Sequence, residues 1–252
     1  MITEGLPIET ENLKQHTIGQ SVLLHLLPGI LTGAGYFALR PFLNQWGFPS
    51  MMALMCAVVL ILLPVELGYL LYEGKKKNGY FSLRGVVLYR KPIPLQQYFL
   101  WIPAIFVLMG IIFIPMKPVD AFFQQKLFSW VPVFESGLQV GYSQSALIWT
   151  YIMVAIFGVV IAPTVEEFYF RGYLLPRMEY AGKWAPLLHT FLFGIYHVWT
   201  PWMFLTRTLG MLPITYAVRR RNLNLGIISH ILVNSLDVIT AISFIIGMSS
   251  IA

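Results

Sequence analysis

Long apolar segments separated by short polar ones dominate this chain of 252 residues. An α-helix needs about 20 apolar residues to cross the hydrocarbon core of a membrane. Seven segments of roughly this length lie near 21–43, 51–72, 97–115, 146–168, 184–201, 204–218 and 224–248. The clearest lies between Glu135 and Glu166, where 30 consecutive residues carry no Asp, Glu, Lys or Arg. The pattern predicts an all-α fold, a polytopic transmembrane helix bundle of about seven to eight spans.

The charges between these segments predict how the bundle is oriented. Basic residues cluster in alternate loops, at 73–96, 169–183 and 219–221. The intervening loops are uncharged or balanced, at 44–50 and 116–145. Because basic loops stay on the cytoplasmic side, we expect a cytoplasmic N-terminal tail (1–20), an outer C-terminus and a location in the cell membrane. Two membrane regions follow the tail, 21–145 and 146–252.

Composition supports the membrane class and narrows the partners. Hydrophobic residues make up 57% of the chain and charged residues 11%, against about 25% charged in soluble domains. The net charge of +6 sits in the loops as a topology signal, so we expect membrane lipids and no nucleic acid as partners. A single cysteine, Cys56, excludes an internal disulfide and a cysteine metal cluster. The mixed segment 119–134 is typical of an interfacial helix on the outer leaflet.

Ionisable side chains at membrane depth are costly and are kept mainly where they have a function. The N-terminal region offers three of them: His25, Arg40 and Glu66. The C-terminal region offers eight: Glu166, Glu167, Arg171, His189, His197, Arg207, His230 and Asp237. This asymmetry predicts a functional site in the last four spans, within region 146–252.

Two adjacent glutamates have different predicted roles. Neighbouring residues on a helix point about 100° apart, so Glu166 and Glu167 cannot face one point. Glu167 and Arg171 are spaced i, i+4 and can form an ion pair, which leaves Glu166 free to face a polar cavity and act as a general base. The simpler interpretation is a surface ion pair closing a span at its cytoplasmic end.

Polar side chains on two later spans complete the candidate site. His197 follows an apolar run, and His230 and Asn234 are spaced i, i+4, so they share a helical face that Asp237 continues. A single intramembrane histidine is usually a core residue bonded to a carbonyl, which is how we interpret His25 and His189.

Hydrolysis of an amide needs an activated water, a donor to the oxyanion and a proton for the leaving amine. Glu166 and His197 can hold and deprotonate the water, while His230 and Asn234 can donate to the oxyanion. No serine nucleophile or cofactor is required. A metal-dependent alternative would use Glu166, His197 and His230 as ligands to Zn²⁺, although the His-Glu-x-x-His spacing of soluble metalloproteases is absent.

Three motifs in order carry a family resemblance: Glu166-Glu167-x-x-x-Arg171, Phe193-x-x-x-His197 and His230-x-x-x-Asn234. Over about 147–240 the chain resembles the CAAX prenyl endopeptidase and bacteriocin-processing family of intramembrane proteases. The resemblance implies Glu166 as the water-activating base assisted by His197, an oxyanion site at His230 and Asn234, and a metal-free glutamate mechanism. We assign Glu167, Arg171 and Asp237 supporting roles. The implied substrate is a peptide or a prenylated protein.

Two other functions fit the same residues. A non-catalytic immunity or scaffold protein would use the polar cluster to bind a peptide without cutting it. A transporter would use Glu166, Glu167 and Asp237 as an ion site, but the chain shows no internal repeat of the kind many transporters have. The protease hypothesis requires that polar side chains from three helices converge in one buried pocket.

Overall fold

The computed structural model describes residues 13–138 and 141–249, and every regular element within these ranges is helical. The predicted all-α membrane fold is confirmed. Five helical segments are long and apolar enough to cross a membrane: Ile18–Gln45, Ser50–Asn78, Leu95–Lys126, Gln144–Arg177 and Leu223–Met248. The first twelve residues of the predicted tail and the last three of the predicted outer C-terminus lie outside the described residues.

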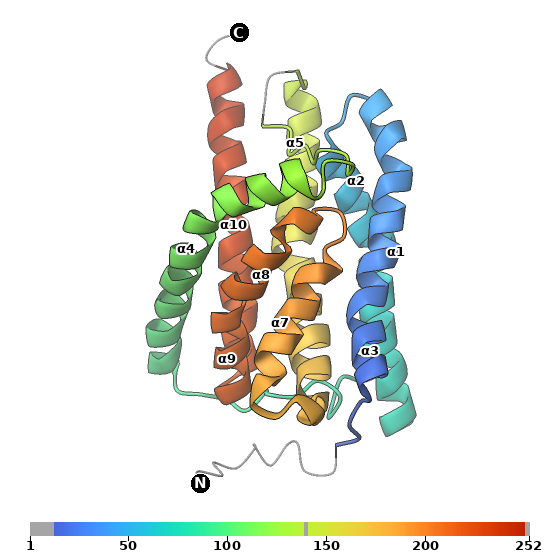
Figure 1. The fold of residues 1–252 in the computed structure, drawn as a ribbon, viewed down its shortest axis with the longest axis vertical. Helices are drawn as coiled ribbons and strands as arrows, with labels where there is room; N and C mark the ends of the chain where they lie inside the picture. The colour runs from blue at the N-terminus through green and yellow to red at the C-terminus, as the bar shows by residue number, and fades with distance from the viewer. Residues whose placement is uncertain (1–12, 139–140, 250–252) are drawn as a thin grey trace.

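The long segments correspond to labelled helices in Figure 1. They are α1 (Ile18–Gln45), the pair α2 (Ser50–Ala57) and α3 (Leu63–Asn78), α4 (Leu95–Lys126), the run from α5 (Gln144–Met153) through α6 (Ala162–Glu166), and α10 (Leu223–Ser249). The end of α3, the start of α7 (Ala185–Tyr196) and the turn before α10 lie at the same end of the bundle (Figure 1). All three predicted basic loops therefore share one end of the molecule.

The predicted spans 184–201 and 204–218 are shorter helices than expected. Here α7 has 12 residues and is followed by α8 (Phe204–Gly210) and α9 (Leu212–Arg220). At about 1.5 Å per residue, α7 measures about 18 Å, against the roughly 30 Å of a hydrocarbon core. Together these helices form a hairpin inside the bundle (Figure 1).

The hairpin tip is stabilised by protein contacts, as backbone at membrane depth requires. The Arg207 guanidinium donates to the Thr200 carbonyl at 3.1 Å and to the Thr200 hydroxyl at 2.8 Å. The two arms pack tightly because Gly194 has no side chain: a Cβ there would lie 2.5 Å from the Phe204 carbonyl oxygen. An internal hairpin therefore replaces the two full spans.

The second half of α4 bends across the end of this hairpin (Figure 1). Prolines at 115 and 118 lie inside the helix, and proline removes a backbone hydrogen bond and kinks a helix. Beyond the bend, Asp120 accepts a hydrogen bond from Thr206 at 2.5 Å, and Phe123 stacks on Phe204. The predicted interfacial helix is thus helical only to Lys126, as a continuation of α4 that covers α8.

Two spans share a local irregularity close to a buried glutamate. Wide π-helical turns occupy η2 (Val58–Leu62) and η3 (Val154–Ile161), and each ends two residues before a proline, Pro64 or Pro163. A π turn bonds each N–H to the carbonyl five residues earlier, and proline has no N–H to continue the series. Each proline therefore removes one backbone donor from the helix, two residues before Glu66 and three residues before Glu166.

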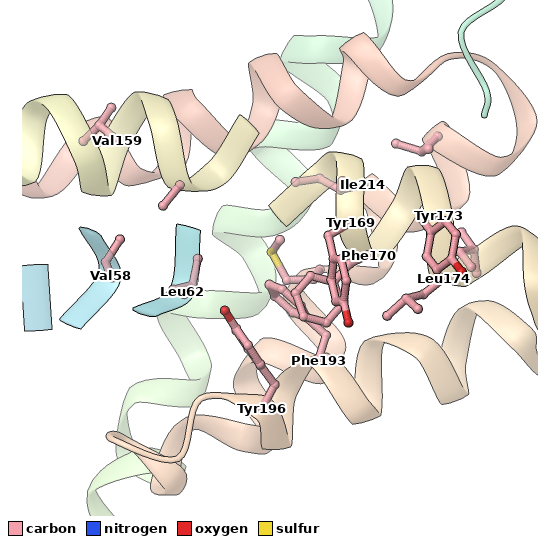
Figure 2. Packing of buried hydrophobic residues seen from close by; sticks show 14 of the residues in the cluster. Val58, Leu62, Val159, Tyr169, Phe170, Tyr173, Leu174, Phe193, Tyr196 and Ile214 are labelled. Carbon is pink, nitrogen blue, oxygen red and sulfur yellow. The ribbon is translucent and has the colours of Figure 1, made fainter. Parts of the chain in front are cut away.

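Aromatic side chains fill the core beside these turns. Figure 2 shows Phe170 from η4 (Glu167–Leu174) meeting Phe193 and Tyr196 from α7. Their ring centroids lie 4.9 Å and 4.8 Å from that of Phe170, in edge-to-face arrangements that aromatic pairs favour. This packing fixes α7 against the helical segment Gln144–Arg177, which carries Glu166 and Glu167 and is called the glutamate helix below. It also sets where the Tyr196 hydroxyl points.

Candidate active site

The first part of the site is a closed polar cluster around Glu167. Its Oε1 atom lies 3.1 Å from Arg171 Nη1 and 3.0 Å from His230 Nδ1. Glu167 and Arg171 are both 0% exposed, and the predicted i, i+4 ion pair is present. A carboxylate only accepts hydrogen bonds, so His230 Nδ1 carries a proton and donates it. We call Glu167, Arg171 and His230 the clamp, because it joins α10 to the glutamate helix.

The clamp closes because α10 approaches the glutamate helix at a glycine. A Cβ added to Gly226 would lie 2.6 Å from Glu167 Oε2 and 2.6 Å from Val218 Cγ2. Gly226 precedes His230 by four residues, so both lie on one face of α10. A larger residue at 226 would push this face away and lengthen the His230–Glu167 bond.

The second part of the site is built on the Tyr196 hydroxyl. This oxygen lies 3.1 Å from Glu166 Oε1 and 3.0 Å from Glu66 Oε1. Glu66 comes from α3, Tyr196 ends α7, and Glu166 ends α6, so three separate helices meet here. We call these three residues the tyrosine bridge. The other Glu166 oxygen, Oε2, lies 3.9 Å from His230 Nε2, so the bridge and the clamp touch.

The positions of these residues along their helices agree with a single layer. Glu166 lies 11 residues from Arg177, and Tyr196 lies 11 residues from Ala185, both counted from the basic end of the bundle. Glu66 lies 12 residues from Asn78 at the same end. Glu166 is 7% exposed, and Tyr196 and His230 are the polar side chains next to its two carboxylate oxygens.

His197 differs in its setting from the helix interior that the sequence indicated. It is the first residue beyond α7, with φ −80° and ψ 61°. Its Nδ1 lies 2.9 Å from the Phe193 carbonyl oxygen, which only accepts, so Nδ1–H donates there. In the neutral ring Nε2 then carries the lone pair and can accept a proton or a hydrogen bond from water. The ring centroid lies 4.8 Å from that of Tyr196.

Asn234 has a partner that the sequence did not reveal. Its side-chain nitrogen donates to the Gly158 carbonyl oxygen at 3.0 Å. The Ala162 N–H bonds to Phe157, five residues back, and the next N–H in that series would belong to Pro163, which has none. Asn234 satisfies the carbonyl left free by this interruption. The amide nitrogen carries two protons, so one is still available to donate elsewhere.

The remaining predicted residues lie apart from this centre. Asp237 is exposed on α10, two helical turns beyond His230. His25 and His189 form a buried pair, with His25 Nε2 3.0 Å from His189 Nδ1 and His25 Nδ1 2.7 Å from the Ser21 carbonyl oxygen. His25 thus fits the interpretation of a core histidine bonded to a carbonyl, whereas His189 bonds to His25 and its buried Nε2 has no hydrogen-bond partner among the described residues.

Sequence reasoning missed Glu66 and Tyr196 as site residues. It placed the site in the last four spans because ionisable residues concentrate there, yet Glu66 reaches it from α3. The signal was present, since a single acidic residue inside an apolar run is by default a functional hypothesis. Tyr196 gave no comparable signal, because a tyrosine in an apolar helix is ordinary core.

The metal-dependent alternative requires three ligand side chains that converge on one point. In the described ranges, no group of three His, Cys, Asp or Glu side chains is arranged to hold a metal ion. His197 Nδ1 and His230 Nδ1 are both engaged, which leaves only their Nε2 atoms as ligand donors.

Comparison with known proteins gives one match. Residues 147–236 match the family model described as type II CAAX prenyl endopeptidase Rce1-like. Neither the comparison with curated proteins nor that with solved structures found a match. The matched segment begins in α5 and ends in α10, and it contains the whole clamp, Tyr196, His197 and Asn234. Glu66 lies outside it.

Proposed function

From the premise that residues 147–236 form an Rce1-like domain, we propose that this membrane protein is an intramembrane endopeptidase in which Glu166 activates the attacking water. The observation that carries the proposal is the buried Glu166 carboxylate, which Tyr196 holds at Oε1 while Oε2 faces His230. A carboxylate held in this way, with one oxygen free, is what general-base catalysis requires.

In the first step, Glu166 Oε2 takes a proton from water while the water oxygen attacks the scissile carbonyl carbon. His197 orients the water by accepting a hydrogen bond from its second hydrogen at Nε2. This nitrogen has a free lone pair because the Nδ1–H donates to the Phe193 carbonyl. The carbonyl π bond breaks as the new C–O bond forms, which leaves a negative charge on the carbonyl oxygen.

Two donors stabilise this oxyanion. Glu167 fixes the His230 ring through Nδ1–H, so an imidazolium form presents its second N–H on the side of Glu166. Asn234 supplies the amide proton that the Gly158 bond does not use. Pre-placed donors of this kind give large rate effects because no reorganisation is needed as charge develops.

Collapse of the tetrahedral intermediate completes the reaction. The C–O π bond re-forms, the C–N bond breaks, and the proton held by Glu166 moves to the leaving nitrogen. The products are a carboxyl group and an amine, and Glu166 returns as carboxylate. Atoms and charge balance without a metal or a covalent enzyme intermediate.

The proposed substrate is a prenylated protein with a C-terminal CAAX sequence, or a hydrophobic peptide that is matured by cleavage. The family description supports the first of these. With the basic loops and N-terminal tail in the cytoplasm, the catalytic layer lies in the cytoplasmic half of the bilayer, where a prenylated C-terminus could reach it.

Purified protein incubated with a farnesylated CAAX peptide should release the C-terminal tripeptide, detected by mass spectrometry. Glu166→Gln should lower turnover at least about 10³-fold while keeping the wild-type melting temperature. Glu179→Gln makes the same chemical change at an exposed position and should cleave normally. Normal turnover by Glu166→Gln would end the proposal, and tight peptide binding without cleavage by the wild type would favour the non-catalytic binding function.

A further inference from the structure

Glu66 is the site residue that the family match does not explain. It lies in α3, outside residues 147–236, and it is 0% exposed. Its Oε1 lies 3.0 Å from the Tyr196 hydroxyl, while Oε2 is buried and has no hydrogen-bond partner among the described residues. A buried acidic side chain with one contact to the site needs a chemical reason.

The reason follows from counting protons in the tyrosine bridge. A phenol has one proton, yet the Tyr196 oxygen contacts both Glu66 and Glu166 at hydrogen-bond distance. If both carboxylates were ionised, one contact would bring two lone pairs together. Both contacts are hydrogen bonds only when one carboxyl carries a proton and donates it to the phenol oxygen.

The surroundings decide which carboxyl carries that proton. Glu166 Oε2 lies 3.9 Å from the His230 ring, and the Arg171 guanidinium is anchored on the adjacent Glu167. The Arg171 guanidinium favours a negative charge on Glu166, and the His230 ring is a polar neighbour of its second oxygen. Among the described residues Glu66 forms a hydrogen bond only with the Tyr196 hydroxyl, and a buried carboxylate without a cationic partner in contact is strongly disfavoured.

We infer that Glu66 is a positioning residue for the proposed hydrolysis, acting as a neutral acid that donates to Tyr196, which in turn donates to Glu166 Oε1. The inference rests on the proposed function of Glu166. The chain of donors occupies Oε1 and leaves Oε2 as the atom that takes the proton from water. Successive hydrogen bonds polarise one another, so the first donor strengthens the second.

The first test separates a neutral donor from an ionised carboxylate. Glu66→Gln keeps a donor of similar shape, whereas Glu66→Leu removes it. On the farnesylated peptide, Glu66→Leu should lower kcat about 10- to 100-fold with KM within about twofold of wild type. Glu66→Gln should restore most of the lost kcat. Equal loss in both variants would show that Glu66 acts as an ionised group and would overturn the inference.

The second test asks whether Glu66 acts through Tyr196. In a Tyr196→Phe background the relay is already broken, so adding Glu66→Leu should change kcat no further. Multiplicative losses would mean that Glu66 acts by another route, which contradicts the inference. Glu179→Leu at an exposed position is the matched control and should cleave like wild type.

A third measurement needs neither turnover nor a Leu variant that folds. The infrared difference spectrum of wild type minus Glu66→Gln should contain the carbonyl stretch of a protonated carboxylic acid. Its absence would contradict a neutral Glu66. Full activity of Glu66→Leu beside an inactive Glu166→Gln would reject this inference alone, whereas an active Glu166→Gln would reject the proposed function itself.

Discussion

The clamp and the tyrosine bridge place adjacent glutamates in opposite settings. Glu167 is held by an arginine and a histidine, and its Oε1 atom receives both contacts. Glu166 has one tyrosine on Oε1, and its Oε2 atom lies beyond hydrogen-bond distance from His230. A carboxylate paired with an arginine and a histidine joins helices, whereas we propose that the one with a single tyrosine partner takes a proton. We propose that one helical step of about 100° separates a structural glutamate from a catalytic one.

The two groups also differ in how far they reach through the chain. All three clamp residues lie in the segment that matches the Rce1-like family model, on the glutamate helix and α10. The bridge adds Glu66 from α3 and so makes the N-terminal helices part of the site. The N-terminal region is therefore more than a membrane anchor for the C-terminal one.

Breaking the clamp should have the largest effect on stability. Arg171→Met leaves the buried Glu167 charge with His230 alone, and loss of one partner of a buried ion pair costs about 3–5 kcal/mol. Chemical unfolding in detergent measures this change in the free energy of unfolding. Arg84→Met makes the same substitution at an exposed residue and should shift it by less than about 0.5 kcal/mol. Equal small shifts would mean that the clamp does not stabilise the fold.

Removing the Asn234 amide should affect turnover more than folding. Asn234→Ala deletes the proposed oxyanion donor, so kcat should fall about 10²- to 10³-fold. Its loss also leaves the Gly158 carbonyl unpaired, at a cost of about 1–3 kcal/mol in the free energy of unfolding.

Asn224→Ala, on the exposed side of the same helix, is the matched control and should keep wild-type kcat. If Asn234→Ala lowers the melting temperature but leaves kcat unchanged, Asn234 supports only the helix pair.

Treatment with a chelator tests whether the activity attributed to Glu166 depends on a metal. A water-activating carboxylate works unaided, so EDTA or phenanthroline should leave the cleavage rate within about twofold of its starting value. Loss of activity that added Zn²⁺ restores would support the metal-dependent alternative with Glu166, His197 and His230 as ligands.

The smallest effect is expected at Asp237, which lies outside both groups. Asp237→Asn removes an exposed charge two turns from His230, so kcat should change by less than about twofold and the free energy of unfolding by less than about 0.5 kcal/mol. A loss comparable to that of Asn234→Ala would restore the supporting role that the sequence assigned to Asp237.

The sequence predicted the helical membrane fold because apolar runs of spanning length are a strong signal. It also predicted the Glu167–Arg171 pair, since i, i+4 spacing fixes which side chains meet within one helix. Contacts between helices were harder to derive. The contact of Glu66 with Tyr196 joins α3 to the end of α7, and no sequence periodicity reveals such a contact.

Other differences have local physical causes. Two expected spans became an internal hairpin because the backbone leaves helical geometry at His197, and Arg207 satisfies the exposed carbonyl of Thr200. The Asn234–Gly158 bond arises where a π turn meets Pro163, a tertiary consequence of a local break. The Asn234–Gly158 bond requires coordinates, because it joins residues 76 positions apart in the chain.

The most direct test of this division compares Glu166→Gln with Glu167→Gln in one preparation, measuring kcat on the farnesylated peptide and the melting temperature of each. We expect Glu166→Gln to lose at least about 10³-fold in kcat with an unchanged melting temperature. Glu167→Gln should melt several degrees lower because it removes the charge at the centre of the clamp. A catalytically active Glu166→Gln, or one destabilised as much as Glu167→Gln, would contradict the assignment of Glu166 to chemistry and Glu167 to structure.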